Sequence, residues 1–146
     1  VRAAVPDRPL EAFDGLDVVG DHVGVGVDDL PNRVLVAGRD DGTVTSLTPA
    51  LSDPTVHEVG GRPTAIAAVD GTPWVLDRDR DRMLSLDTER SIPLPAPAFA
   101  AAPTGDGDTV VVAHYDDDLI SLVSTADREV IWTSETPADP FEPLVL

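Results

Sequence analysis

The chain has 146 residues, 42% of them hydrophobic, which is enough for one domain with a real core. Its 10 basic residues stand against 27 acidic ones, a net charge of −17, so we exclude nucleic acid as a partner because phosphate backbones bind mainly cationic groups. The sequence contains no Cys and no Lys, which excludes disulfides, thiolate nucleophiles, Cys-based zinc sites, Schiff-base lysines and phosphate-loop lysines.

Twelve short β-strands are predicted along the chain. The apolar runs are short and rich in β-branched residues, which favours strands buried on both faces over helices. Turn residues separate the runs, as at Leu30-Pro31-Asn32, Asp70-Gly71 and Gly105-Asp106-Gly107. The expected strands are, in chain order, 23–27, 34–37, a run ending at Leu47, 55–59, 65–69, 74–76, a run ending at Leu86, 91–94, 98–102, 110–113, a run ending at Leu122, and 129–133.

Three twelve-residue windows repeat along the chain and align without a gap. They cover 36–47, 75–86 and 111–122, and in each an apolar run meets a cluster of Asp, Arg and Gly before a second run ends in Ser-Leu. Each window therefore predicts a β-hairpin. Four strands recurring every 36–39 residues are typical of a β-propeller blade. A β-sandwich is the alternative, although it would not need the same turn chemistry at a fixed period.

The middle repeat carries a family resemblance. Its strand start is Val59-Gly60-Gly61-Arg62-Pro63-Thr64, its turn is Asp70-Gly71, its next strand is Trp74-Val75-Leu76, and Met83-Leu84-Ser85-Leu86-Asp87-Thr88 follows. This pattern resembles a blade of the YVTN/NHL-type propellers and extends, less regularly, from Asp17 onward. The first repeat departs from it with Leu-Pro-Asn in place of Asp-Gly, and the third places Pro97 two positions early. The resemblance implies an all-β propeller with blades at about 22–60, 61–96 and 97–134.

Three blades do not close a ring, because each blade buries its faces against neighbours. Residues 135–146 match the start of a further blade, with Pro140 standing where Pro63 stands, and Leu16 to Gly20 resembles the last strand of a preceding one. We therefore expect an incomplete ring. Further blades of the same protein would complete it, or a second copy of the chain would; the first is favoured because both ends fall within a blade.

A candidate ligand-binding surface follows from the repeat alignment. The alignment places three basic residues at one repeat position, at the end of the second strand, where they would face the same mouth of a ring. Together with their neighbours they predict a basic crescent for an anionic ligand; the alternative is simple pairing with adjacent carboxylates, worth ~0–1 kcal/mol each. The candidate residues are Arg39, Arg78, His114, Asp40, Asp79 and Tyr115.

The hairpins also gather eight aspartates, Asp77 among them, which we interpret as stabilising tight turns at solvated tips. The series Asp77-x-Asp79-x-Asp81 is not a calcium loop, because Arg82 stands where Gly belongs and Thr88 where Glu belongs. The three histidines occupy different blade positions, so no zinc site is predicted. We expect no metal, no cofactor and no catalytic residue in this chain.

We therefore expect a non-catalytic propeller scaffold that binds a protein or small ligand through loops at one mouth. The rival is a propeller enzyme; the resemblance includes streptogramin lyases and lactonases, whose catalytic residues would lie partly outside this chain. Trp74 is expected in the core, and Trp132 is expected to be partly buried. The sequence has no run of about 18 apolar residues, so no membrane-spanning segment is expected. Because many proteins of the type it resembles are exported, an extracellular or periplasmic location is expected over a cytoplasmic one.

Overall fold

The computed structural model describes residues 22–28, 33–141, 143 and 145, with side chains from residue 33 onward. These residues form three antiparallel sheets of four strands, and in each sheet the strands lie in chain order. The first sheet contains β1 (His22–Asp28), β2 (Arg33–Gly38), β3 (Thr43–Leu47) and β4 (Thr55–Glu58). The second contains β5 (Pro63–Val69), β6 (Thr72–Asp77), β7 (Arg82–Ser85) and β8 (Ser91–Pro93). The third contains β9 (Ala100–Pro103), β10 (Thr109–His114), β11 (Leu119–Ser124) and β12 (Glu129–Glu135).

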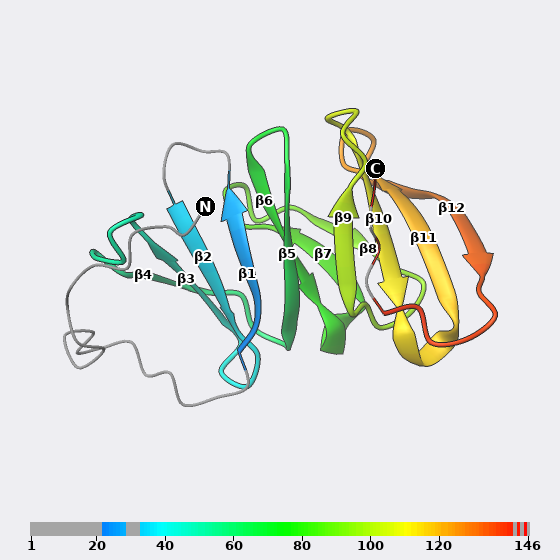
Figure 1. Ribbon diagram of the computed structural model, residues 1–146, viewed down its shortest axis with the longest axis horizontal. Helices are drawn as coiled ribbons and strands as arrows, with labels where there is room; N and C mark the ends of the chain where they lie inside the picture. Colours follow the sequence, from blue (N-terminus) through cyan, green and yellow to red (C-terminus); the bar gives the residue numbers. More distant parts are fainter. Residues whose placement is uncertain (1–21, 29–32, 142, 144, 146) are drawn as a thin grey trace.

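The three sheets stand side by side and follow one another along the chain (Figure 1). Their first strands β1, β5 and β9 pack against each other in turn, as the inner strands of consecutive propeller blades do. We call the sheets blades 1, 2 and 3. The predicted fold class, an all-β incomplete propeller with three four-stranded blades, is confirmed. The predicted strand at 16–20 and the turn at 30–32 lie outside the described residues, and no helix within the described part is long and apolar enough to cross a membrane.

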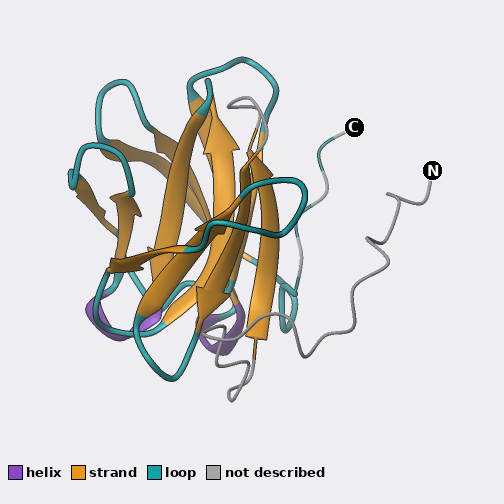
Figure 2. Ribbon diagram, turned by 90° about the vertical axis from the view of Figure 1, so that its left-hand side faces the viewer, coloured by secondary structure: helices purple, strands orange, loops and turns teal. Residues whose placement is uncertain are grey.

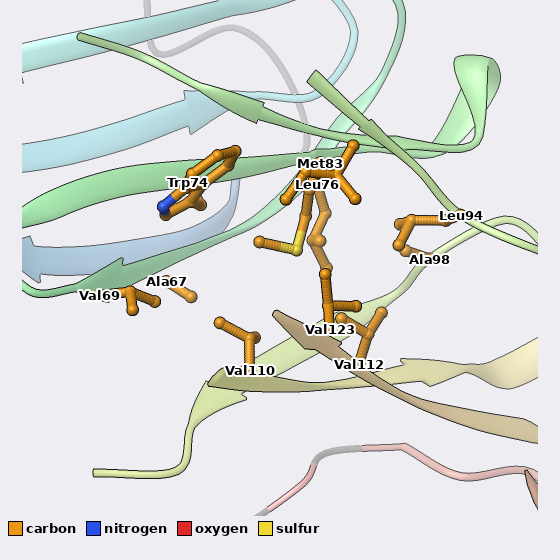
Figure 3. Packing of buried hydrophobic residues seen from close by; sticks show 11 residues of the cluster. Ala67, Val69, Trp74, Leu76, Met83, Leu94, Ala98, Val110, Val112 and Val123 are labelled. Atoms are coloured by element: carbon orange, nitrogen blue, oxygen red, sulfur yellow. The ribbon is translucent and has the colours of Figure 1, made fainter. Parts of the chain in front are cut away.

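The core consists of two apolar layers, one between each pair of neighbouring blades. Between blades 1 and 2, Leu35 meets Val75 within a cluster of buried residues. Between blades 2 and 3, Trp74 and Leu76 face Val110 across a larger cluster (Figure 3). Strand β6 is thus buried on both faces, as its apolar run predicts, and Trp74 is a core residue with 5% exposure.

A backbone hydrogen bond recurs where each blade leads into the next. The hairpin between the second and third strands ends in a residue with positive φ, and the carbonyl of that residue accepts an N–H from the segment after the outer strand. Gly has no Cβ and therefore adopts such a φ without steric strain, and Asp adopts it more readily than most other residues. The three bonds are Gly60 N to Gly42 O at 2.8 Å, Leu94 N to Asp81 O at 2.7 Å, and Thr136 N to Asp118 O at 2.7 Å. The interpretation of these aspartates as turn residues is confirmed for Asp81 and Asp118.

The structure corrects the alignment of the third repeat by one residue. The last strand pair before each hairpin turn is Gly38 with Thr43 in blade 1, Asp77 with Arg82 in blade 2 and His114 with Leu119 in blade 3. His114 therefore corresponds to Asp77, and it is Tyr115 that corresponds to Arg78 and Arg39. A shift of one residue moves a side chain to the opposite face of a strand. The shared Ser-Leu ending concealed this shift, because it lies after the turn.

The linker between blades 1 and 2 passes so close to the blade 2 hairpin that it requires glycine. Gly60 and Gly61 both have positive φ, 66° and 62°. A Cβ on Gly61 would overlap the carboxylate of Asp77, and a Cβ on Gly60 would lie 2.5 Å from the guanidinium of Arg80. At Gly61 this approach excludes a side chain, because the Asp77 carboxylate is buried and hydrogen-bonded; at Gly60 the neighbouring atoms are the end of the half-exposed Arg80 side chain, which can shift.

We predict that Gly61→Ala destabilises the fold by about 3 kcal/mol or more, combining backbone strain with the loss of the Asp77 contacts. Gly105→Ala is the matched control: Gly105 also has positive φ, 84°, but a Cβ there would meet nothing within 4 Å. It should cost only the backbone term, about 1–2 kcal/mol. Urea unfolding of both variants measures the difference, and equal losses would contradict the close approach.

Candidate functional site

The hairpins between second and third strands, and the linkers between blades, all lie at one edge of the molecule. Two of the hairpins contain a short 3₁₀ turn, η2 (Arg78–Arg80) and η3 (Tyr115–Asp117), visible together at the lower edge in Figure 2. We call this edge the hairpin rim. It comprises the hairpins 39–42, 78–81 and 115–118 and the linkers 59–62 and 94–99.

Half of the ten arginines of this acidic chain lie at the hairpin rim or directly beside it. The sequence analysis selected two of them, Arg39 and Arg78. The other three lie at the junction between blades 1 and 2, where the linker after blade 1 contacts the hairpin of blade 2. The sequence analysis missed them because this contact forms only in the folded structure. Those three are Arg62, Arg80 and Arg82.

Asp77 is the centre of this junction. It is the last residue of β6 and is fully buried, so its assignment to a solvated hairpin tip is wrong. Its Oδ1 accepts the backbone N–H of Arg62 at 3.0 Å, and its Oδ2 accepts from Nε of Arg82 at 3.0 Å. Arg82 and Arg80 in turn donate to the carbonyl of Val59, at 3.1 and 3.2 Å. One buried carboxylate thus joins the linker and the hairpin, and we call these five residues the Asp77 cluster.

His114 takes the same position at the junction of blades 2 and 3. It is fully buried, and its Nδ1 lies 2.9 Å from the carbonyl of Ala96, so Nδ1 carries the proton and donates. Its Nε2 then accepts from the hydroxyl of Ser121 at 2.9 Å. Burial lowers the pKa of His114, since a charged ring is disfavoured there. The ring therefore lies inside the junction and does not join Arg39 and Arg78 at an open surface.

The remaining basic candidates occupy different environments. Arg78 forms an ion pair with Asp116 across blades 2 and 3. Arg39 is partly exposed, and its Nε is buried with no hydrogen-bond partner among the described residues. The neighbouring Asp40 is exposed and lies 4.0 Å from the guanidinium of Arg62, and Asp79 is exposed. Arg39 thus has a donor without a partner at the position where Arg78 is paired.

Tyr115 gives the third blade an aromatic rim. Its ring forms a triangle with Phe99 and Phe141: the centroids of these two rings are 5.7 and 6.3 Å from that of Tyr115 and 5.1 Å from each other. Phe141 is 61% exposed. Since Tyr115 corresponds to Arg39 and Arg78, the rim changes from basic to aromatic at blade 3.

A pocket of about 120 Å³ lies between blades 1 and 2 and is lined by His57, Glu58 and Glu89 with four neighbours. The ring of His57 contacts the hydroxyl of Ser46, with Nε2 3.2 Å from Oγ. Ser46 is only 6% exposed, so its oxygen is shielded from a substrate. Within the described part of the chain, no three His, Asp or Glu side chains gather as a metal site would require.

No protein-family model matches the sequence, and no curated protein matches it either. Among solved structures, the chain is similar to hydrazine synthase of Kuenenia stuttgartiensis, with a TM-score of 0.73 and 17% identity over 89% of this chain and 41% of that one. It is similar to virginiamycin B lyase of Staphylococcus aureus, with a TM-score of 0.71 and 12% identity over 83% and 44% of the two chains. For a chain of the nidogen/laminin complex, the TM-score is 0.70, with 9% identity over 82% and 49%.

The fold is that of a β-propeller. At these identities the similarity shows the fold alone, and the matched proteins include both enzymes and binding proteins. It does not distinguish the YVTN/NHL type from other propellers. The chain spans less than half the length of each of these structures.

We predict that Asp77→Ala lowers the free energy of unfolding by about 3–5 kcal/mol, because it leaves the buried side of Arg82 and the N–H of Arg62 without an acceptor. Asp79→Ala is the matched control: Asp79 is exposed two residues away, and its loss should change stability by about 0.5 kcal/mol or less. Chemical denaturation of both variants tests this. A small loss in Asp77→Ala would contradict the central role of the Asp77 cluster.

A pH dependence follows from His114. The folded state lowers the pKa of this ring below its ordinary value of 6.5, so the unfolded chain binds the extra proton first as the pH falls. The contribution of His114 is therefore fully present above pH 6.5 and is lost below it, at up to ~1.4 kcal/mol per pH unit, until the folded ring also protonates. Urea unfolding between pH 5 and 7.5 measures this slope. His114→Gln should remove that part of the slope, and an unchanged slope would contradict the prediction.

Proposed function

We propose that the chain is a non-catalytic propeller scaffold that binds an anionic group of a protein or small ligand at the hairpin rim, with Arg39 as the principal contact. The observation that supports this proposal is the buried Nε of Arg39, which has no partner among the described residues. Arg39 is partly exposed and forms no ion pair with the other described residues, so an anion can approach the exposed part of this side chain without displacing a carboxylate. The other candidate residues, Arg78, Asp40, Asp79 and Tyr115, lie on the hairpins of the same rim.

The charge distribution supports an anionic ligand despite the net charge of −17. Arginines gather at the rim although the chain is acidic. Three of them each lie close to a carboxylate: Arg78 pairs with Asp116, Arg82 pairs with Asp77, and Arg62 lies near Asp40. The planar guanidinium fork matches carboxylate, sulfate and phosphate groups. The acidic remainder of the chain repels anions at long range. Binding would therefore depend on direct hydrogen bonds from the guanidinium group and would favour ligands whose anionic group can contact it directly.

The rival function, a propeller enzyme of the streptogramin-lyase or lactonase type, has no contact in the described residues that favours it. The two serine–histidine pairs, Ser46 with His57 and Ser121 with His114, hold their hydroxyls almost completely buried. Mass spectrometry of a streptogramin B substrate and of a simple lactone after incubation with the chain separates the two proposals. Turnover of either substrate would favour the enzyme. The YVTN/NHL type and the extracellular or periplasmic location remain predictions from the sequence.

The binding proposal is tested by NMR of the arginine Nε–H signals during titration with citrate and, separately, with inorganic phosphate. We predict that the Arg39 signal shifts first and that Arg39→Gln weakens binding about tenfold, equal to ~1.4 kcal/mol. Arg90→Gln is the control, since Arg90 is exposed in the turn between β7 and β8, away from the rim. If Arg90→Gln weakens binding as much as Arg39→Gln, or if the Arg39 signal stays unchanged, the proposal fails.

A further inference from the structure

Each blade has a forward face, toward the following blade, and a backward face, toward the preceding one. On the forward face of blade 2, Trp74 and Leu76 pack against blade 3. On blade 3 the corresponding face carries the cross-strand partners Val111, Leu122 and Trp132. Cross-strand partners lie on the same side of a sheet, so these three form one apolar row. Trp132 is 52% exposed, so this row is open to solvent at its outer end.

Blade 1 has the complementary open face. Its residues Leu35 and Val44 pack toward blade 2, so the cross-strand partners Val36, Thr45 and Val56 lie on the backward face. Val56 is 56% exposed. In blade 2 the backward face, which includes Val75 and Leu84, is the one that packs on blade 1. The open forward face of blade 3 and the open backward face of blade 1 are thus the same two kinds of face that pack together between blades 1 and 2 and between blades 2 and 3.

The start of a third junction is already present at blade 3. Thr136 donates its N–H to the carbonyl of Asp118, as Leu94 does to Asp81 one blade earlier. Phe141 then packs on Phe99 and Tyr115 at the rim end of the face. The repeated bond shows that the segment after β12 leaves blade 3 as the two earlier linkers leave blades 1 and 2, each of which has a blade on its forward face. Phe141 does not cover the outer end of the face, where Trp132 is 52% exposed.

We propose that a second copy of this chain supplies that blade, so that two three-blade arcs close a six-bladed ring around a two-fold axis. The forward face of blade 3 in each copy packs on the backward face of blade 1 in the other copy. Closed two-fold symmetry leaves neither face unpaired, and six blades lie within the 4–8 that propellers use. In three solved structures of this fold the chain matches 41–49% of the length, so in each of them more than half of the chain lies outside the part matched by these three blades. The proposal is independent of the anion-binding function.

Two physical consequences follow for the association. Each copy carries a charge of −17, so repulsion between copies opposes the dimer and salt strengthens it by screening. The inner strand of the partner's blade 1 needs the place beside β9 that Phe141 approaches. Phe141→Ser, which loosens this contact, should therefore dimerise at least as tightly as the unmodified chain.

Sedimentation velocity of the 146-residue chain tests the proposal at low salt and at about 0.5 M salt. The expected species is a dimer of about twice the 15.4 kDa chain mass, with a dissociation constant that falls as salt rises. Trp132→Asp and Val56→Asp should each weaken dimerisation at least tenfold, since both place a charge in a junction. The matched controls are Thr133→Asp and Thr55→Asp, at exposed neighbouring residues on the opposite faces of the same strands. Circular dichroism checks that all four variants remain folded.

A mixture of the two weakened variants gives a sharper test. In a mixed dimer, one junction joins the altered blade 3 to the altered blade 1, and the other junction is entirely native. Mixed dimers of Trp132→Asp with Val56→Asp should therefore form more tightly than either variant dimerises alone. A monomeric unmodified chain, larger open polymers, or control variants that dissociate as much as the face variants would each overturn the proposal. Anion binding at Arg39 is measured separately, so its loss would not be confused with loss of the dimer.

Discussion

The arrangement of blades 1 and 2 depends on one buried carboxylate. Asp77 is fully buried, yet both of its oxygens are used, one by the backbone of the linker and one by Arg82 of the hairpin. Burying a charge is costly unless it is paired and hydrogen-bonded, and here both conditions are met within one short loop region. The glycine at position 61 follows from the same constraint, because the carboxylate occupies the space where a Cβ would lie. The arginines beside Asp77 then extend the contact to the carbonyl of Val59.

At the junction of blades 2 and 3, the residue at the end of the second strand meets a hydrogen-bond acceptor of the linker, whereas Asp77 meets a donor. Between blades 2 and 3 the linker contains Pro95 and Pro97, which have no N–H to offer, and it presents the carbonyl of Ala96 instead. A carboxylate at this position would face another acceptor, whereas the neutral ring of His114 donates from Nδ1 and accepts at Nε2. The identity of the residue at the end of the second strand is thus matched to the backbone chemistry of the linker. Asp77 and His114 are structural equivalents despite having no chemical similarity.

This matching explains which parts of the structure the sequence could predict. Strand positions follow from short apolar runs and turn residues, which are local signals, and all twelve strands lie where these signals indicate. The roles of Asp77 and His114 are set by hydrogen bonds to linkers 15 and 18 residues away, which no local pattern records. The ungapped alignment matched His114 with Arg78 because the windows share the Ser-Leu ending after the turn. The strand register pairs His114 with Leu119 and so identifies Asp77 as its equivalent.

The acidic and basic side chains of the chain occupy different parts of the structure, which the net charge alone does not show. Exposed aspartates such as Asp40 and Asp79 surround the rim, while the arginines are drawn into contacts between blades, at Arg82 with Asp77 and Arg78 with Asp116. Positive charge is therefore used mainly inside the arc, and negative charge is left mainly outside. An arc built in this way repels its own copies at long range but presents apolar rows, such as the one ending at Trp132, at its two open faces. Association then requires those faces to meet in register, because short-range apolar contact is the interaction that can offset the repulsion.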